Sequence, residues 1–171
     1  MTGRGARKGA HPAARMKEAA GRLALRRHEM AKLARLAEHP EDLDARLPVY
    51  SRKAFLRIAA RAAAQGKPGC LVLIDLSGGA GEKAADMAHA CQLINRDTRA
   101  TDIIGRAGKA RLALLLHDAG EDGGWSAARR LARLISEAGA AGVRVSVMEL
   151  AGAMGNLAPL EALAEKLCLV F

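Results

Sequence analysis

An arginine and an aspartate three positions apart, Arg99 and Asp102, are the residues whose types and spacing best suit ligand chemistry. A guanidinium donates two parallel hydrogen bonds to a phosphate or to the edge of a guanine base, and its flat face can stack on a purine. A carboxylate accepts hydrogen bonds from the N–H groups of a guanine, which a cation cannot do. The pair is therefore a candidate ligand-binding site.

The spacing alone does not decide the matter. A chain of 171 residues with 19 arginines and 8 aspartates is expected to contain about one such pair by chance. The structural alternative is an exposed ion pair at a helix end, which stabilises the helix by only ~0.3 kcal/mol. The elements around the pair must therefore decide between the two interpretations.

Hydrophobic patterns of helices and strands alternate along the chain from residue 51 onward. Apolar residues at helical spacing predict helices over residues 51–64, 82–99 and 125–138. Short apolar or alternating runs predict strands over residues 70–76, 102–106, 111–117 and 143–148, with a hairpin turn at 107–110. The tail from 159 to 171 is expected to be a short helix, with a further strand as the alternative for its apolar end. This order predicts an α/β sandwich, with helices packed on a mainly antiparallel sheet.

Positive charge is concentrated in the first 35 residues. The chain carries 27 Lys and Arg against 18 Asp and Glu, a net charge of +9, and its first 35 residues hold ten of these cations but only Glu18 and Glu29. Residues 1–12 lack periodicity and are expected to form a disordered basic tail. Apolar residues then recur every seven positions from Met16 to Ala37, which predicts a basic amphipathic helix over residues 13–39. Residues 40–171 form the remaining domain.

Two interpretations of this basic arm stay open. It can pack one stripe on the domain or on a second copy, which would make a homodimer. Alternatively, the cations between residues 4 and 35 contact the phosphates of a nucleic acid or another anionic surface. The arm has no base-reading helix-turn-helix pattern, so contact with nucleic acid would be weak, non-specific and sensitive to salt.

Composition argues against several classes of protein. No apolar run approaches the ~20 residues that cross a bilayer, and the start lacks the apolar core of a secretory signal, so we expect a cytoplasmic protein. Four aromatic residues are too few to stack single-stranded nucleic acid. The three cysteines, Cys70, Cys91 and Cys168, are widely spaced in apolar surroundings and fit buried, reduced thiols rather than disulfides or a metal site.

Taken together, these elements resemble the GGDEF family, the diguanylate cyclase domain that makes the bacterial second messenger cyclic di-GMP, over residues 44–150. The opening pattern D-x-L-T-x-L-x-N-R-x-x-F corresponds to residues 44–55, which keep Asp44, Arg52 and Phe55. The strand pattern LLxxDxDxFK corresponds to residues 71–77, and the pattern R-x-G-G-D-E-F to residues 106–112. The resemblance implies a nucleotidyl cyclase-like sandwich, with the order and spacing of the matches as its basis.

The departures from the family imply a degenerate domain. In active members, the aspartate of the first strand and the third residue of the GGDEF turn hold the metal ions that bridge the phosphates of GTP. Asp75 keeps the first position as a vestige, but the turn consists of Gly108, Lys109, Ala110, Arg111 and Leu112, so an alanine replaces the second ligand and a cation follows it. The guanine-recognising N-D-x-x-G-H segment is missing. We therefore expect no catalysis, no bound metal and no cofactor.

The resemblance also gives the Arg99–Asp102 pair a role. In many GGDEF proteins an R-x-x-D motif five residues before the turn forms an inhibitory site that binds cyclic di-GMP, and the pair stands at that offset. An arginine on the helix after the hairpin often completes the site, and its counterpart is Arg130, or Arg129 beside it. The resemblance thus implies a non-catalytic cyclic di-GMP receptor with an unidentified macromolecular partner. The alternatives are a ligand-free dimerisation or scaffold module and a non-specific nucleic-acid binder.

Overall fold

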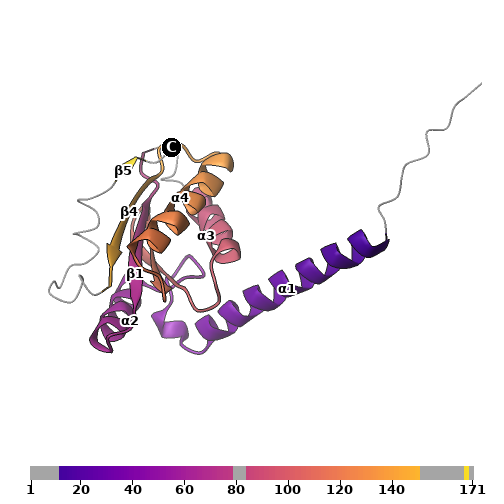
Figure 1. Ribbon diagram of the computed structural model, residues 1–171. Coiled ribbons are helices and arrows are strands. Elements are labelled where there is room, and N and C mark those ends of the chain that lie inside the picture. Colours follow the sequence, from indigo (N-terminus) through magenta and orange to yellow (C-terminus); the bar gives the residue numbers. More distant parts are fainter. Residues whose placement is uncertain (1–11, 79–83, 151–167, 170–171) are drawn as a thin grey trace, which may run out of the picture.

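A five-stranded sheet lies at the centre of the computed structural model, which describes residues 12–78, 84–150 and 168–169 (Figure 1). The strand order is β2-β3-β1-β4-β5, and every neighbouring pair is antiparallel. The strands are β1 (Gly69–Asp75), β2 (Ile103–Gly108), β3 (Arg111–His117), β4 (Arg144–Glu149) and β5 (Cys168–Leu169). The predicted α/β architecture with a mainly antiparallel sheet is confirmed.

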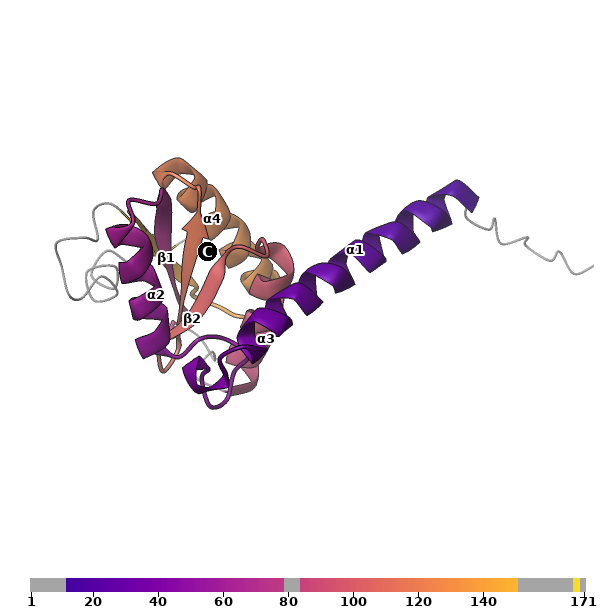
Figure 2. The same ribbon diagram turned by 90° about the horizontal axis from the view of Figure 1, so that it is seen from below.

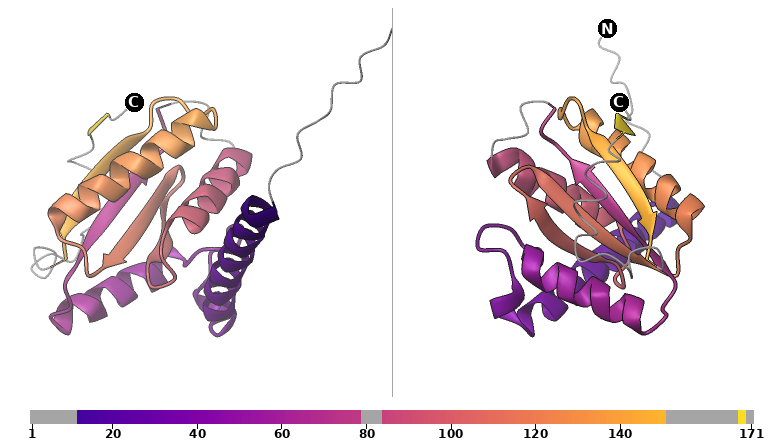
Figure 3. Two further views of the ribbon diagram at one scale, coloured as in Figure 1. Left: turned by 45° about the vertical axis from the view of Figure 1, so that its right-hand side comes forward. Right: turned by 90° about the vertical axis from the view of Figure 1, so that its left-hand side faces the viewer.

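Helices cover both faces of the sheet (Figure 3). Helix α2 (Arg52–Ala64) packs on one face, and helices α3 (Ala84–Asp97) and α4 (Glu121–Glu137) pack on the other. Successive residues of a strand point to opposite faces. In β1, Leu71 and Leu73 therefore join the α2 cluster, whereas Val72 and Ile74 join the cluster of α3 and α4. All seven residues of β1 are buried, which explains its continuous apolar run.

Close packing at a glycine brings α2 onto the outer strand β2. A Cβ atom built on Gly105 would lie 2.4 Å from the Cβ of Phe55, well inside the contact distance of two carbon atoms. Phe55 itself is completely buried. Only a residue without a side chain lets the start of α2 lie this close to β2, and this contact sets the depth of α2 on the sheet.

Helix α1 (Pro12–Ala37) precedes the domain and projects away from it (Figures 1 and 2). Its C-terminal part contacts α3 and the short 3-10 helix η1 (Pro40–Asp42). Beyond η1, Tyr50 forms isolated bridges with Leu43 and with Gly105 of β2, which fasten the connecting segment to the edge of the sheet. Pro40 stands just after the helix, as expected for a residue that disfavours helix before it.

Several element boundaries differ from those expected. Helix α4 begins at Glu121 rather than at 125, because Glu121 and Asp122 in its first turn favour the positive end of the helix dipole. A bulge between Arg106 and Gly108 extends β2 and shortens the hairpin turn. Helix α3 ends at Asp97, two residues before the expected end at residue 99. The helix expected over 159–171 and the disordered tail expected over 1–12 lie outside the described residues, except that Pro12 belongs to α1 and residues 168–169 form β5.

Two of the three cysteines have the buried environment expected from the sequence. Cys70 of β1 and Cys91 of α3 are free thiols with no exposed surface. Burial raises the pKa of Cys70 to about 11 and that of Cys91 to about 12, so both stay protonated at neutral pH. Protonated, inaccessible thiols of this kind serve as small apolar core residues rather than as nucleophiles.

Candidate functional site

Asp75, the last residue of β1, lies between two arginines of the neighbouring strands. Its partners in the strand register are Arg111 on β3 and Arg144 on β4. Arg111 donates from Nε to Oδ2 of Asp75 at 2.7 Å, and Arg144 donates from Nη2 to the same oxygen at 3.2 Å. Asp75 is completely buried, whereas both arginine side chains are partly exposed. The end of the central strand is therefore a cluster of one carboxylate and two guanidiniums.

Ser77 completes this cluster. Its main-chain N–H donates to Oδ1 of Asp75 at 2.7 Å, and its hydroxyl accepts a hydrogen bond from Arg144 at 2.8 Å. Burial by itself would raise the pKa of Asp75, but hydrogen bonds from Ser77 and Arg111 outweigh this effect and hold the pKa below its ordinary value. Asp75 is therefore ionised at neutral pH, and the three charged side chains together carry one net positive charge.

The residues at this position do not fit a divalent cation. Both carboxylate oxygens of Asp75 accept hydrogen bonds from protein donors, and two guanidiniums would repel a metal ion. Ala110, in the turn between β2 and β3, has no side-chain oxygen to offer a metal ion and is 6% exposed. Within the described ranges, no three His, Cys, Asp or Glu side chains are grouped to hold a metal.

An arginine also holds the turn between β2 and β3. Arg106 donates from Nε to the carbonyl oxygen of Gly108 at 2.5 Å and from Nη2 to that of Lys109 at 2.6 Å. Leu112, which ends the five-residue turn segment, is completely buried in the core. The side chain of Arg106 thus closes the turn, and the buried side chain of Leu112 fixes the end of the turn to the core.

The Arg99–Asp102 pair closes the turn between α3 and β2. Asp102 accepts a hydrogen bond through Oδ2 from the main-chain N–H of Arg99 at 2.8 Å, and its own N–H donates to the carbonyl oxygen of Arg99 at 3.1 Å. Asp102 is only 9% exposed, while the side chain of Arg99 lies at the surface. The carboxylate therefore fixes the main chain of the turn that presents the Arg99 guanidinium.

Of the two arginines expected to complete the site, the structure brings Arg130 to the end of α3. Arg130 donates from Nε to Oδ2 of Asp97 at 2.5 Å and from Nη2 to the carbonyl oxygen of Asp97 at 3.3 Å, two residues before Arg99. Arg129 instead lies over the ring of Trp125 on its own helix, 5.8 Å from the ring centroid. Arg130 thus contacts the C-terminal end of α3, just before Arg99, whereas Arg129 contacts Trp125.

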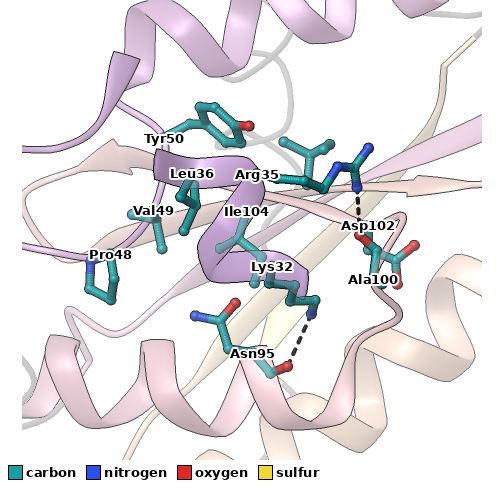
Figure 4. A pocket seen from close by; sticks show the side chains of 11 residues that line it. Lys32, Arg35, Leu36, Pro48, Val49, Tyr50, Asn95, Ala100, Asp102 and Ile104 are labelled. Carbon is teal, nitrogen blue, oxygen red and sulfur yellow. Dashed lines mark hydrogen bonds between the residues drawn. The ribbon is translucent and has the colours of Figure 1, made fainter. Parts of the chain in front are cut away.

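Sequence reasoning missed the residues of α1 that contact this same turn. Lys32 is 7% exposed and donates from Nζ to the carbonyl oxygens of Asn95 and Thr98 at 3.0 and 2.9 Å, and to the Thr98 hydroxyl at 2.6 Å. Arg35 donates to the carbonyl oxygen of Ala100 at 2.5 Å (Figure 4). His28 Nε2 lies 2.5 Å from the carbonyl oxygen of Thr98. The spacing of these three basic residues along one helix face was the available signal.

The contact between α1 and the turn is tightly packed. Burial lowers the pKa of Lys32 to about 8, although the charges of Asp102 and Asp97 act in the opposite direction. The cavity that remains between α1, Tyr50 and Asp102 has a volume of about 20 Å³, which is room for about one water molecule (Figure 4). This cavity is too small for a purine to enter between α1 and Asp102.

None of the helices in the described part of the chain has the length and hydropathy of a membrane span.

Solved GGDEF domains share this fold. The FimX GGDEF domain from Pseudomonas aeruginosa is 16% identical, with a TM-score of 0.60, 73% of this chain covered and 90% of that chain. The GGDEF domain of DgcB from Caulobacter crescentus in complex with c-di-GMP is 17% identical, with a TM-score of 0.58 and coverages of 74% and 82%. A longer form of DgcB, with its coiled coil, covers 90% of this chain and 88% of that chain at 18% identity and a TM-score of 0.57.

No protein-family model matches the sequence, and no curated protein matches it either. The structural likeness at this level of identity concerns the fold, and it agrees with the nucleotidyl cyclase-like sandwich expected from the sequence. The GGDEF fold is therefore the fold of this chain.

Proposed function

We propose that this protein is a non-catalytic receptor for cyclic di-GMP that signals to a macromolecular partner. The GGDEF domain of DgcB, which shares this fold, was solved in complex with c-di-GMP, and so was the S helix-GGDEF-EAL protein LapD from Vibrio cholerae, of which the likeness covers 35%. The observation that carries the proposal is that Arg130 of α4 is hydrogen-bonded to Asp97 at the end of α3, two residues before the exposed Arg99. Two exposed guanidiniums there can engage the phosphates and stack on the bases of a dinucleotide.

Asp102 has a different task in this proposal from the one its sequence spacing suggests. Its Oδ2 is bonded to the main chain of Arg99, and it is almost completely buried. It therefore acts on the ligand through Arg99, by keeping the turn in one conformation. Arg99 and Arg130 supply the direct contacts, and Arg129 is left with Trp125.

The Asp75 cluster supports the non-catalytic part of the proposal. Two-metal chemistry on GTP needs carboxylate oxygens that are free to bind Mg²⁺. Arg111 and Arg144 occupy the carboxylate of Asp75, and Ala110 offers no replacement. We therefore expect no cyclic di-GMP after incubation with GTP and Mg²⁺, as followed by chromatography. Formation of product would contradict this part of the proposal.

Isothermal titration calorimetry with cyclic di-GMP tests the binding part. We expect saturable binding by the wild-type protein, with at least a tenfold loss of affinity in Arg99→Ala and in Arg130→Ala, since a hydrogen bond to a charged group contributes about 1.5–3 kcal/mol. Arg61→Ala is the matched control, because Arg61 is an exposed arginine on α2, on the opposite face of the sheet. The absence of heat with the wild type, or equal affinity in all four proteins, would refute the proposal.

A ligand-free dimerisation module is the second candidate function. Leu23 and Met30, seven residues apart on α1, are 53% and 64% exposed. Large apolar side chains at heptad spacing on a projecting helix suit contact with the same helix of a second copy. Analytical ultracentrifugation of the full chain with Leu23→Glu and Met30→Glu tests this function. It predicts a wild-type dimer that the double variant loses, and a monomeric wild type would exclude it.

A further inference from the structure

Two cations of α1 hold the main chain on both sides of Arg99. Lys32 donates to the carbonyl oxygen of Thr98 at 2.9 Å. Arg35 donates to the carbonyl oxygen of Ala100 at 2.5 Å (Figure 4). Asp102 holds the N–H of Arg99 itself at 2.8 Å. Three hydrogen bonds, made by Lys32, Arg35 and Asp102, therefore hold the main chain of the turn that presents the Arg99 guanidinium. Two of these hydrogen bonds come from a helix 65 or more residues earlier in the chain.

The side chain of Lys32 is buried within the contact between α1 and the end of α3. An ammonium group that is 7% exposed needs hydrogen-bond partners to offset its lost hydration, and the three oxygen acceptors from Asn95 and Thr98 supply them. The carbonyl groups at the C-terminal end of α3 also carry the negative end of the helix dipole, which attracts a cation. The end of α3 is thus a docking point for α1 as well as the start of the ligand-binding turn.

We infer that Lys32 and Arg35 are positioning residues for Arg99, so that docking of α1 and binding of ligand at this turn are coupled. This inference rests on the proposed function. A turn that is already held pays less conformational entropy when a ligand binds to it. Because coupling between two sites is reciprocal, a ligand that binds the held turn also favours the docked α1. The part of α1 that projects from the domain (Figure 2) would then carry the signal from the ligand to a partner.

The experiment compares three full-length proteins: wild type, the double variant Lys32→Gln with Arg35→Gln, and the control Arg27→Gln. Arg27 is an exposed cation on the same helix. Hydrogen–deuterium exchange without ligand reports the order of residues 99–102, and calorimetry reports the affinity for cyclic di-GMP. We expect faster exchange at 99–102 and at least a fivefold loss of affinity in the double variant alone, at the lower end of typical coupling strengths.

The outcomes separate this inference from the proposed function. If the wild type does not bind cyclic di-GMP, the proposed function fails, and unchanged exchange at residues 99–102 in the double variant would then overturn the inference as well. If the wild type binds and the double variant binds equally well, the inference fails while the receptor function stands. A purely structural role for Lys32 and Arg35 would lower the melting temperature without a selective change in exchange at 99–102, and this result also overturns it.

A single variant covers the case in which the double variant does not fold. Arg35 is exposed, so Arg35→Gln removes one of the three hydrogen bonds without opening a buried site. We expect at least a twofold loss of affinity for cyclic di-GMP and faster exchange at residues 99–102. Affinity equal to that of Arg27→Gln would overturn the inference.

Discussion

Oδ2 of Asp75 lies 2.7 Å from Nε of Arg111, its direct neighbour across the β1–β3 ladder. Arg144 stands opposite Asp75 on the other side, across the β1–β4 ladder. Directly opposed residues of antiparallel strands bring their side chains together, so the sheet register itself assembles this charged cluster. The end of the central strand is thereby a structural ion-pair cluster, in which one carboxylate is held by two guanidiniums of the protein.

Replacement of the central carboxylate should destabilise the protein. In Asp75→Asn, two guanidiniums lose their shared negative charge. Because both arginines are partly exposed, we expect a loss of only about 1–3 kcal/mol in the free energy of unfolding, less than for a fully buried pair. Urea denaturation provides the measurement. The control Glu137→Gln removes an exposed partner of Arg133, where we expect less than about 0.5 kcal/mol. Equal losses in the two variants would contradict a structural role for the cluster.

The same carboxylate predicts a pH dependence in acid. The pKa of Asp75 lies below 3.8 in the folded protein and near 3.8 in the unfolded chain, so the unfolded chain takes up a proton first as the pH falls. The stability from Asp75 is complete above pH 3.8 and is lost as the pH falls through the folded pKa. The difference in free energy of unfolding between wild type and Asp75→Asn should be constant near neutral pH and shrink below pH 3.8. If this difference in free energy of unfolding grows as the pH falls, the prediction is wrong.

The lowered pKa of Lys32 predicts a second pH dependence of stability, at alkaline pH. The folded protein releases the Lys32 proton near pH 8, whereas the unfolded chain keeps it until about 10.5. Since the folded state binds fewer protons over this interval, the contribution of Lys32 to the free energy of unfolding rises with pH there. Nitrogen-15 NMR of the lysine side chains should show one ammonium with a midpoint near 8, assigned by its absence in Lys32→Arg. If every lysine titrates near 10.5, then Lys32 is not buried against α3.

Gly105 predicts a local steric limit on the fold. In Gly105→Ala, the new methyl group would lie 2.4 Å from the Cβ of Phe55 and would push α2 away from β2. We expect a loss of about 1–3 kcal/mol in the free energy of unfolding, as for other overpacked cores. Gly123→Ala is the control, because its added Cβ meets only Ala119 at 3.6 Å, and an alanine within a helix is favoured by about 0.5–1 kcal/mol. If Gly105→Ala leaves the free energy of unfolding unchanged, α2 does not pack directly on the sheet at this position.

Local patterns were sufficient to predict most of the secondary structure. The apolar run of β1, the alternation in β4 and the helical spacing of α2 reflect side chains that face one core, and periodicity records this directly. The ends of elements were less predictable. The start of α4 at Glu121 depends on a helix-dipole effect of two acidic residues, and the bulge in β2 depends on its pairing with β3.

The candidate site, like the fold, could be predicted from the sequence only in part. The sequence alone provided the Arg99–Asp102 spacing, because it is a property of nearby residues, whereas the absence of a metal-binding carboxylate at Ala110 was predicted only through the resemblance to the GGDEF family. It could not show that Asp102 bonds the main chain of Arg99 rather than a ligand, or that Arg130 reaches Asp97. Hydrogen bonds of this kind depend on side-chain directions and on helix packing.

Residues far apart in the chain met only through the tertiary structure. Arg144 joins Asp75 across 69 positions because two strands share one register, and Lys32 reaches Thr98 across 66 positions because α1 ends beside α3. The sequence by itself determined which residues carry charge and which segments bury an apolar face, since these properties depend on composition and local periodicity. Which charges meet was decided by sheet register and helix docking, because non-local contacts arise only when the whole chain packs.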